Sequence, residues 1–190
     1  MIFKNKANSF NFKLTYFHNQ RWDKTNMVSS LLCASEWLEK YECLVSYSDI
    51  VYSHKAIEKI KGSTADIAIT YDPNWKELWS LRFENPLDDA ETFKLNKNIV
   101  TEVGHRTSCY SNIEGQFMGI IKFSPKGWVA AASYIDKLSL HEIDKLDMTA
   151  LLQLLITKGL KITGIPVYDQ WFEVDTESDL KIYEDLLSND

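Results

Sequence analysis

Apolar and polar positions follow two alternating patterns along the chain, one typical of helices and one typical of strands. Apolar spacing, together with helix start and stop signals, predicts helices in the segments 27–40, 54–61, 125–138, 147–158 and 176–187. Short apolar or alternating runs predict strands in the segments 12–17, 42–47, 66–71, 99–103, 117–123 and 161–167. Because strands and helices alternate, the pattern predicts an α/β fold whose sheet is covered by helices on both faces.

Capping residues indicate where two of these helices begin. Asp147 precedes the apolar segment that stops at Gly159, and Thr176-Glu-Ser-Asp179 resembles a capping box before the last helix. The aromatic and polar stretch 75–91 is interpreted as a helical turn followed by a loop. No repeat, low-complexity tract or linker interrupts the pattern, which predicts one domain over residues 1–190.

Composition and charge narrow the class of protein. The 190 residues are 45% hydrophobic and 25% charged, which are ordinary globular values. A net charge of −6 and a pI near 5.3 argue against a broad nucleic-acid surface, which needs clustered Lys and Arg. No apolar run approaches the ~18 residues of a membrane span, and no secretory signal opens the chain. We therefore expect a cytoplasmic protein with neither nucleic-acid nor membrane partners.

Two acidic residues stand where open α/β sheets collect ligands, at the carboxyl ends of strands. Asp49 follows the apolar run 42–47, and Asp175 precedes the last predicted helix. Carboxylates that converge from two distant segments can share one or two Mg²⁺ ions, which in turn bind substrate phosphates. In the alternative interpretation, Asp49 only ends a strand and Asp175 only helps to cap a helix.

Several segments, taken in order, resemble one family of enzymes. Glu173-Val-Asp-Thr-Glu-Ser-Asp-Leu180 resembles the closing motif of sugar-phosphate and phosphocholine-type nucleotidyltransferases. Ser46-Tyr-Ser-Asp49 resembles the strand that carries their first metal aspartate. Further similar segments are 21–28 (the loop facing the nucleotide base), 75–91 (a cytidylyltransferase subgroup of surface-glycan pathways) and 116–123 (the strand beside the acceptor).

This resemblance covers residues 12–190 and implies a three-layer Rossmann-like fold with a mostly parallel or mixed sheet. It also implies transfer of CMP or another nucleoside monophosphate from CTP or another NTP to a phosphorylated small molecule, with pyrophosphate release, for surface-glycan or lipid modification. The residues that match the family's metal ligands, Asp49 and Asp175, would be the catalytic pair and would hold Mg²⁺.

Five residues are candidates for contacts to the substrates. Thr25 and Asn26 would hydrogen-bond a base or ribose, or they only start the helix that follows. Trp75, Trp79 and Arg82 would frame the acceptor, with the rings against a cationic or planar group and the guanidinium on its phosphate. Alternatively, Trp75 and Trp79 form one buried helical face, because they are four positions apart.

Two further acidic candidates come from loops and strand edges. Asp89, together with Asp88 and Glu91, would bind polar groups of the acceptor, or it belongs to a solvated acidic loop. Glu114 would assist the metal site or the acceptor, or it is a carboxylate at a strand edge.

The triphosphate loop of this family has no counterpart in the sequence. The family opens with a Gly-rich loop, an Arg and a later Pro-Lys, whose N–H groups and cations hold the triphosphate, whereas the seven glycines here form no such loop. We therefore expect an N-terminally truncated fold, in which Met1 corresponds to an internal position of a longer chain. Because the triphosphate loop is missing, we also expect this chain to be inactive alone. Loss of the first βαβ unit would expose a sheet edge, which predicts homo-oligomers.

Two other functions stay open at this point. A non-catalytic remnant of the fold, which binds a nucleotide or a partner without turnover, agrees with the missing loop. A glycosyltransferase of similar layout would also use an acidic pair, but it normally shows Asp-x-Asp, whereas Asp49 is followed by Ile50 and Val51. The pair Asp49 and Asp175 favours an enzyme.

Overall fold

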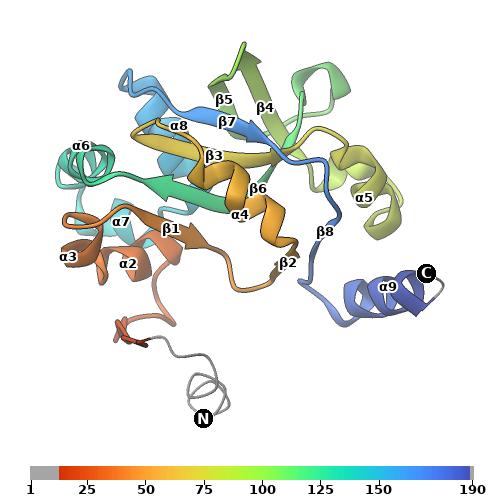
Figure 1. The fold of residues 1–190 in the computed structure, drawn as a ribbon, viewed down its shortest axis with the longest axis horizontal. Helices are drawn as coiled ribbons and strands as arrows, with labels where there is room; N and C mark the ends of the chain where they lie inside the picture. Colours follow the sequence, from red (N-terminus) through yellow and green to blue (C-terminus); the bar gives the residue numbers. More distant parts are fainter. Residues whose placement is uncertain (1–12, 189–190) are drawn as a thin grey trace.

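A mixed six-stranded sheet runs through the computed structural model of the chain, which describes residues 13–188 (Figure 1). The strands lie side by side in the order β1 (Cys43–Ser46), β6 (Gln116–Phe123), β3 (Ile67–Asp72), β7 (Thr163–Pro166), β5 (Ile99–Arg106) and β4 (Glu91–Asn96). The neighbours β3 and β7 are parallel, and the other neighbouring pairs are antiparallel. Of the two arrangements that the sequence predicts, the structure has the mixed sheet.

One face of this sheet is covered by helices from two parts of the chain. They are α2 (Met27–Leu32), α3 (Ser35–Leu38), α6 (Pro125–Ile135), α7 (Leu140–Lys145) and α8 (Met148–Thr157). Fully buried Trp128 of α6 meets Phe123 of β6 edge-on, with ring centroids 5.4 Å apart. Leu151 and Leu155 of α8 fill the same apolar layer, so burial of these side chains fixes the helices on the sheet.

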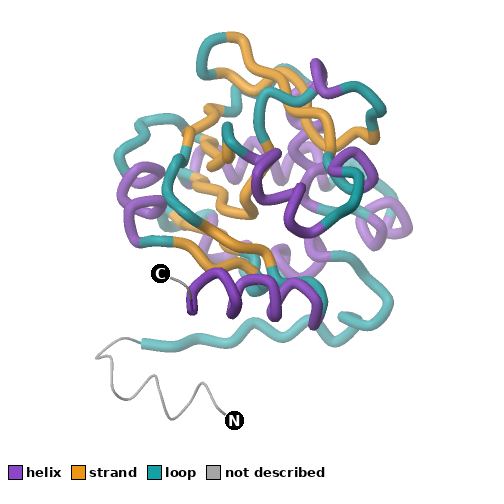
Figure 2. Tube along the Cα trace, turned by 90° about the vertical axis from the view of Figure 1, so that its right-hand side faces the viewer, coloured by secondary structure: helices purple, strands orange, loops and turns teal. Residues whose placement is uncertain are grey.

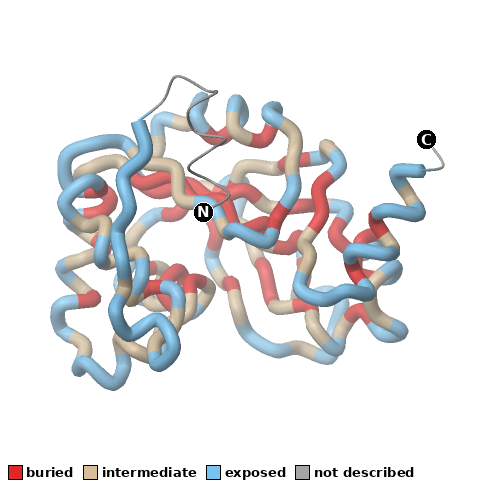
Figure 3. The backbone as a smooth tube through the Cα atoms, turned by 90° about the horizontal axis from the view of Figure 1, so that it is seen from below, coloured by how far each residue is buried: buried red, intermediate tan, exposed pale blue. Residues whose placement is uncertain are grey.

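The opposite face carries a second apolar layer and a second, smaller sheet. The elements there are α4 (His54–Lys61), α5 (Trp75–Arg82), α9 (Glu177–Ser188) and the antiparallel pair of β2 (Ile50–Tyr52) and β8 (Trp171–Glu173). Ile60, Trp79 and Trp171 are buried in this layer. Figure 2 shows the strands among the surrounding helices, and Figure 3 shows the buried positions concentrated in the interior. The predicted three-layer α/β architecture is confirmed.

Capping residues start two helices as the sequence predicts. The Asp147 side chain accepts a hydrogen bond from the Ala150 N–H (2.7 Å) at the start of α8. Before α9, the Thr176 hydroxyl accepts from the Asp179 N–H (3.2 Å), and the Asp179 carboxylate accepts from the Thr176 N–H (2.8 Å). These reciprocal bonds form a capping box, with Asp179 in the position usually held by Glu or Gln.

Two predictions about the first forty residues are wrong. Residues 13–17 of the predicted strand 12–17 are exposed and have no regular structure, and residue 12 lies outside the described residues. Alternating side chains give that segment one apolar and one polar face, but a strand also needs a neighbouring strand to hydrogen-bond its backbone N–H and C=O groups. The predicted helix 27–40 is divided into α2 and α3, because the helical turns end at Cys33 and begin again after Ala34.

Three strands and one α-helix have no counterpart in the sequence-based prediction. The strand β4 and the helix α7 lie in stretches that the apolar pattern leaves as loop, although Ser139 and Glu142 form a capping box at α7. The strands β2 and β8 are only three residues long, and Ile50 pairs with Glu173 across most of the chain. Such short strands form through distant partners, which local periodicity does not reveal.

The strand β1 occupies one edge of the large sheet. Within residues 13–188, no strand pairs with its outer side. Because β4 occupies the other edge, as in any open sheet, an exposed edge caused by a missing unit stays a prediction, and so does pairing with a second chain. In the same part of the chain, no helix has both the length and the apolar character needed to cross a membrane.

Gly119 of β6 allows Tyr47 to lie against the sheet. Its φ is +80°, and a Cβ there would lie 2.8 Å from the Tyr47 ring. Gly159 has a similar φ of +84° with no atom within 4 Å of a Cβ. A substitution at Gly159 therefore measures only the cost of the backbone conformation, without a steric clash.

We predict that Gly159→Ala lowers the free energy of unfolding by about 1–2 kcal/mol, the cost of a left-handed L-residue. Gly119→Ala should lower it by about 1–3 kcal/mol more, because the added methyl overpacks against Tyr47. Urea denaturation measures both values. Equal losses in the two variants would contradict the role of Gly119 in seating Tyr47.

Candidate functional site

The small sheet brings Asp49 and Asp175 next to each other. Ile50 is paired with Glu173, and the Val174 N–H donates to the Asp49 carbonyl at 2.8 Å. Asp49 directly precedes β2, Asp175 follows β8 by one residue, and both residues are exposed. The structure therefore places these two residues, which are distant in the sequence, at the ends of the neighbouring strands of the small sheet, and their catalytic role stays a prediction.

These two residues fit a hard divalent cation. Magnesium is usually held through one or two carboxylates, with water and substrate phosphates as its remaining ligands. Within residues 13–188, no group of three or more His, Cys, Asp or Glu side chains is arranged to hold a metal. The chemistry of two exposed carboxylates suits such an ion, and the metal site stays a prediction.

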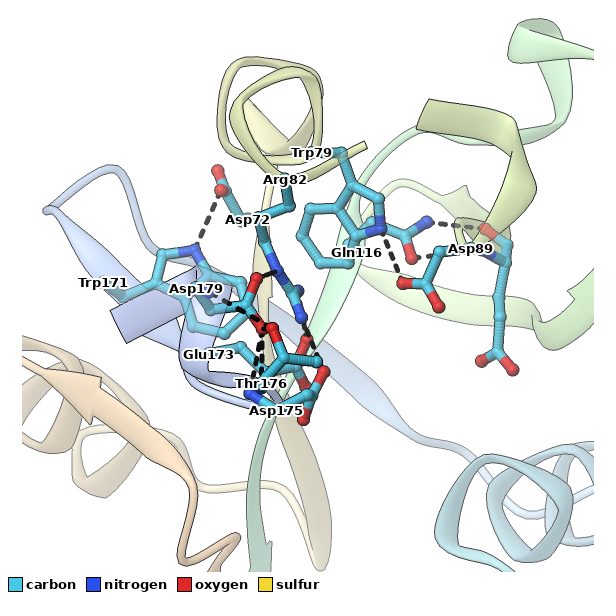
Figure 4. Close-up of polar contacts among 11 residues, drawn as sticks. Asp72, Trp79, Arg82, Asp89, Gln116, Trp171, Glu173, Asp175, Thr176 and Asp179 are labelled. Carbon is cyan, nitrogen blue, oxygen red and sulfur yellow. Dashed lines mark hydrogen bonds and ion pairs between the residues drawn. The ribbon is translucent and has the colours of Figure 1, made fainter. Parts of the chain in front are cut away.

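Arg82 lies behind Asp175 as the centre of a cluster of ion pairs (Figure 4). Its side chain is only 1% exposed. Its nitrogens donate to Glu173 (Nη1–Oε2, 2.8 Å), Asp175 (Nη2–Oδ2, 2.5 Å) and Asp179 (Nε–Oδ1, 3.0 Å). A single guanidinium from α5 thus holds three carboxylates of β8 and the start of α9. The phosphate contact that the sequence predicts for Arg82 stays a prediction.

The pKa values of two partners of Arg82 move in opposite directions. Burial raises the pKa of Asp179, but hydrogen bonds from Arg82 and Thr176 outweigh burial and hold this pKa below its ordinary value. Burial also raises the pKa of Glu173, and there the bond from Arg82 does not reverse the effect. Glu173 is therefore the weaker acid of the two.

A cavity of about 260 Å³ opens beside this cluster. Its wall contains four carboxylates and one arginine: Asp89, Glu91, Asp147, Glu173 and Arg106. The remaining wall includes the aromatic rings of Tyr47, Trp79 and Phe117. The cavity therefore carries an excess of negative charge next to aromatic surface, which suits a ligand group with positive charge.

Neighbouring residues fix the acidic side of this cavity. The Trp79 indole N–H donates to Asp89 Oδ2 at 3.0 Å. The Gln116 amide accepts from the Glu91 N–H (3.2 Å) and donates to the Glu91 carbonyl (2.6 Å). Burial raises the pKa of Glu91, and the charge of Asp147 raises it further, against the lowering effect of Thr149 and Arg106.

A second cavity, of about 380 Å³, adjoins the first and contains Asp49 in its wall. Met27, Tyr47 and Glu173 line both cavities, so the two spaces meet at these side chains. Burial raises the pKa of the Tyr47 phenol, and nearby carboxylates raise it further. Tyr47 is therefore a neutral hydrogen-bond donor and acceptor at the junction.

Thr25 and Asn26 lie immediately before Met27. The Asn26 side chain accepts from the Met27 N–H at 2.7 Å, so Asn26 caps α2. The Thr25 hydroxyl accepts from the Asn19 amide (2.8 Å) and donates to the Arg21 carbonyl (3.0 Å). Asn26 therefore starts the helix, as in one of the two interpretations of the sequence. A contact to a base or ribose stays a prediction for both residues.

The other predicted residues divide between the cavity and the core. Trp79 and Asp89 line the cavity of 260 Å³. Trp75 is buried and meets Trp79 edge-on (6.0 Å) and Tyr110 in a stacked arrangement (6.1 Å). The Glu114 carboxylate accepts from the Leu95 N–H at 2.8 Å, in the strand-edge role that was the alternative interpretation.

Several residues of the site have no individual signal in the sequence. Asp147 is recognisable only as a helix cap, and Glu173 only as part of a motif. Tyr47 and Arg106 are single residues at the ends of strands, and Gln116 opens a strand. Only the pairing of distant strands brings them to one cavity, so no spacing along the chain could have indicated them.

The shift of the Glu91 pKa has a measurable sign. The folded value is raised above the unfolded value of about 4.3. The native state therefore holds the proton more tightly, and stability is lost as the pH rises from about 4 through the folded pKa. We predict that Glu91→Gln removes this loss, so that the variant gains stability relative to the wild type as the pH rises.

Urea denaturation from pH 4.5 to pH 8 measures this difference. Glu58→Gln, at an exposed position of α4, is the control for the loss of one negative charge. The control should have the same dependence of stability on pH as the wild type. The same result for Glu91→Gln would show that the folded protein does not raise the pKa of Glu91.

No protein-family model matches the chain. It is 34% identical over 192 residues to the CTP:phosphoglutamine cytidylyltransferase of Campylobacter jejuni subsp. jejuni serotype O:2, with 95% of this chain and 76% of that protein covered.

Two solved structures share the fold. The inositol-1-phosphate CTP transferase of T. maritima matches with a TM-score of 0.74 and 16% identity, over 96% of this chain and 69% of that one. A Bacillus anthracis structure assigned as a glucose-1-phosphate thymidylyltransferase, in complex with sucrose, matches with a TM-score of 0.73 and 13% identity, over 97% and 69%. On the strength of its Campylobacter relative, the chain belongs to the cytidylyltransferase-like family of nucleotidyltransferases that its sequence resembles.

Proposed function

We propose that the protein transfers CMP from CTP to a phosphorylated small molecule that carries an ammonium group. An oxygen of the acceptor phosphate bonds to the α-phosphorus of CTP, the bond from that phosphorus to the bridging oxygen breaks, and pyrophosphate leaves. The relative that is 34% identical is a CTP:phosphoglutamine cytidylyltransferase, which supports this reaction. The observation that carries the proposal is the acidic cavity, which adjoins the cavity that contains Asp49 and has in its wall Glu173, two residues before Asp175.

In this proposal Asp49 and Asp175 hold Mg²⁺. The bound ion neutralises charge on the phosphates and aligns them for displacement. The protein's own residues bind and orient the substrates, because such reactions depend mainly on positioning and electrostatics. Tyr47 stands where the two cavities meet, so its neutral hydroxyl is placed to donate to a phosphate oxygen.

The charges of the cavity support an amino-acid type of acceptor. Glu91, Asp147 and Asp89 would bind the ammonium group, and the Trp79 ring beside them would contribute a cation–π contact. Arg106 would bind a carboxylate on the same acceptor. Phosphoglutamine has both groups, whereas sugar and inositol phosphates have neither. Four carboxylates in one cavity would repel an acceptor whose only charges are those of its phosphate.

The other residues singled out from the sequence would contact the nucleotide or support the acceptor site. Thr25 and Asn26 would contact the base or ribose from the loop before α2. Trp75 and Glu114 would support the acceptor site indirectly, through Trp79 and the β4 backbone. The CMP-linked product is an activated group donor, which agrees with the role in surface-glycan or lipid modification that the sequence resemblance implies.

A pyrophosphate-release assay with CTP, Mg²⁺ and phosphoglutamine tests the reaction. We predict that Asp49→Asn and Asp175→Asn each lower the rate at least about 100-fold, because each removes a ligand of the metal. The control is Asp169→Asn, since this aspartate pairs with Lys55 (3.0 Å) and Lys59 (3.4 Å) on the surface.

The assay is run on the 190-residue chain and on a form that carries any in-frame sequence encoded before Met1. Wild-type rates in both aspartate variants would contradict the catalytic pair. Binding of CTP without turnover in either form would favour the alternative function, a nucleotide-binding protein of this fold without catalysis.

A panel of acceptors tests the ammonium site. We predict that phosphoglutamine is used at least about tenfold better, in kcat/KM, than its N-acetylated form, a change that corresponds to about 1.4 kcal/mol. Glu91→Gln should raise KM for phosphoglutamine and leave the rate with the acetylated acceptor almost unchanged. Equal use of both acceptors would refute recognition of the ammonium group, without affecting the assignment of Asp49 and Asp175.

A further inference from the structure

The Arg82 cluster holds both the backbone and the side chain of Asp175. The guanidinium binds Asp175 Oδ2 at 2.5 Å and Asp179 Oδ1 at 3.0 Å. The other oxygen of Asp179 accepts from the backbone N–H groups of Asp175 (3.2 Å) and Thr176 (2.8 Å). The capping box of α9 is thus one end of a continuous network, and the Asp175 carboxylate is the other.

This network leaves Asp175 able to bind a cation. Its side chain is 48% exposed, although the guanidinium behind it is only 1% exposed. Arg82 hydrogen-bonds Oδ2, and no hydrogen bond to Oδ1 is made within residues 13–188. Three carboxylates around one guanidinium also leave two negative charges uncompensated, in addition to the charge of the neighbouring Asp49.

The shape of the arginine side chain matters for this arrangement. A guanidinium is planar, and its nitrogens point in fixed directions toward separate carboxylates. The Trp79 and Phe83 rings lie 5.7 Å and 5.1 Å from its central carbon and further restrict it. A lysine in this position keeps the charge, but its single ammonium cannot hold Glu173, Asp175 and Asp179 in the same geometry.

We infer that Arg82 is a positioning residue, which orients Asp175 to bind the divalent metal and does not itself bind the acceptor phosphate. This inference rests on the proposed function, in which Asp49 and Asp175 hold that metal. Partners that orient metal ligands typically change metal affinity by 10–100-fold when they are replaced. Arg82 acts on the metal through Asp175, and on the backbone of Asp175 through Asp179.

Titration with Mn²⁺, followed by the electron paramagnetic resonance signal of the free ion, tests the inference without any turnover. We expect that Arg82→Lys weakens Mn²⁺ binding at least about tenfold and that Asp175→Asn removes the site. Asp179→Asn keeps the ion pair between Arg82 and Asp175 and should give a smaller loss, and it answers the question if Arg82→Lys does not fold.

The matched control is Lys122→Met, which removes another buried cation. The Lys122 side chain is 3% exposed, and its Nζ lies 2.8 Å from a Glu42 carboxylate that belongs to neither cavity. Thermal unfolding should show a loss of stability in this variant, while its Mn²⁺ affinity stays within about twofold of the wild type.

The outcomes separate the inference from the function on which it rests. Wild-type Mn²⁺ affinity in folded Arg82→Lys and Asp179→Asn, with the site lost in Asp175→Asn, overturns the inference alone. A higher KM for the acceptor in Arg82→Lys, with unchanged Mn²⁺ affinity, overturns it in favour of a direct phosphate contact. No site dependent on Asp175 in the wild type overturns the metal assignment and the inference together.

Discussion

The buried guanidinium of Arg82 is the interaction on which the rest of the site depends. It joins α5 to β8 and α9, which carry Glu173, Asp175 and Asp179. A buried charge is costly unless it is paired, and removing one partner of a buried ion pair costs about 3–5 kcal/mol. The same contacts that satisfy Arg82 therefore fix the last strand, the start of the last helix and the Asp175 carboxylate. Stability and the geometry of the site have one physical origin here.

Local signals explain which parts of the fold could be predicted from the sequence. The capping residues Asp147 and Thr176 start α8 and α9, because a side chain within three residues satisfies the first N–H groups of each helix. The strands β2 and β8 could not be predicted in this way, because each has three residues and the two pair only with each other, from distant parts of the chain. The segment 13–17 shows the converse. Its alternation is that of a strand, but no neighbouring strand pairs with it among the described residues, and it has no regular structure.

The same distinction applies to the residues of the candidate site. Motifs could indicate Asp49 and Asp175, and the small sheet brings them together. The contacts of Arg82 could not be predicted, because a sequence gives the charge of a residue and not the three carboxylates that surround it. Tyr47 and Arg106 reach the cavity from the ends of β1 and β5, through strand pairing and the positive φ of Gly119.

The central claim is that Arg82 presents Asp175, together with Asp49, to a divalent metal at the edge of an acidic cavity. A crystal structure of the protein with Mn²⁺ and CTP, with the metal located by its anomalous scattering, tests this claim most directly. The account predicts an anomalous peak that is ligated by Asp49 and by Asp175 Oδ1, while Asp175 Oδ2 keeps its bond to Arg82. A peak bound elsewhere, or an Arg82 side chain that leaves Asp175 and contacts a phosphate, would contradict it.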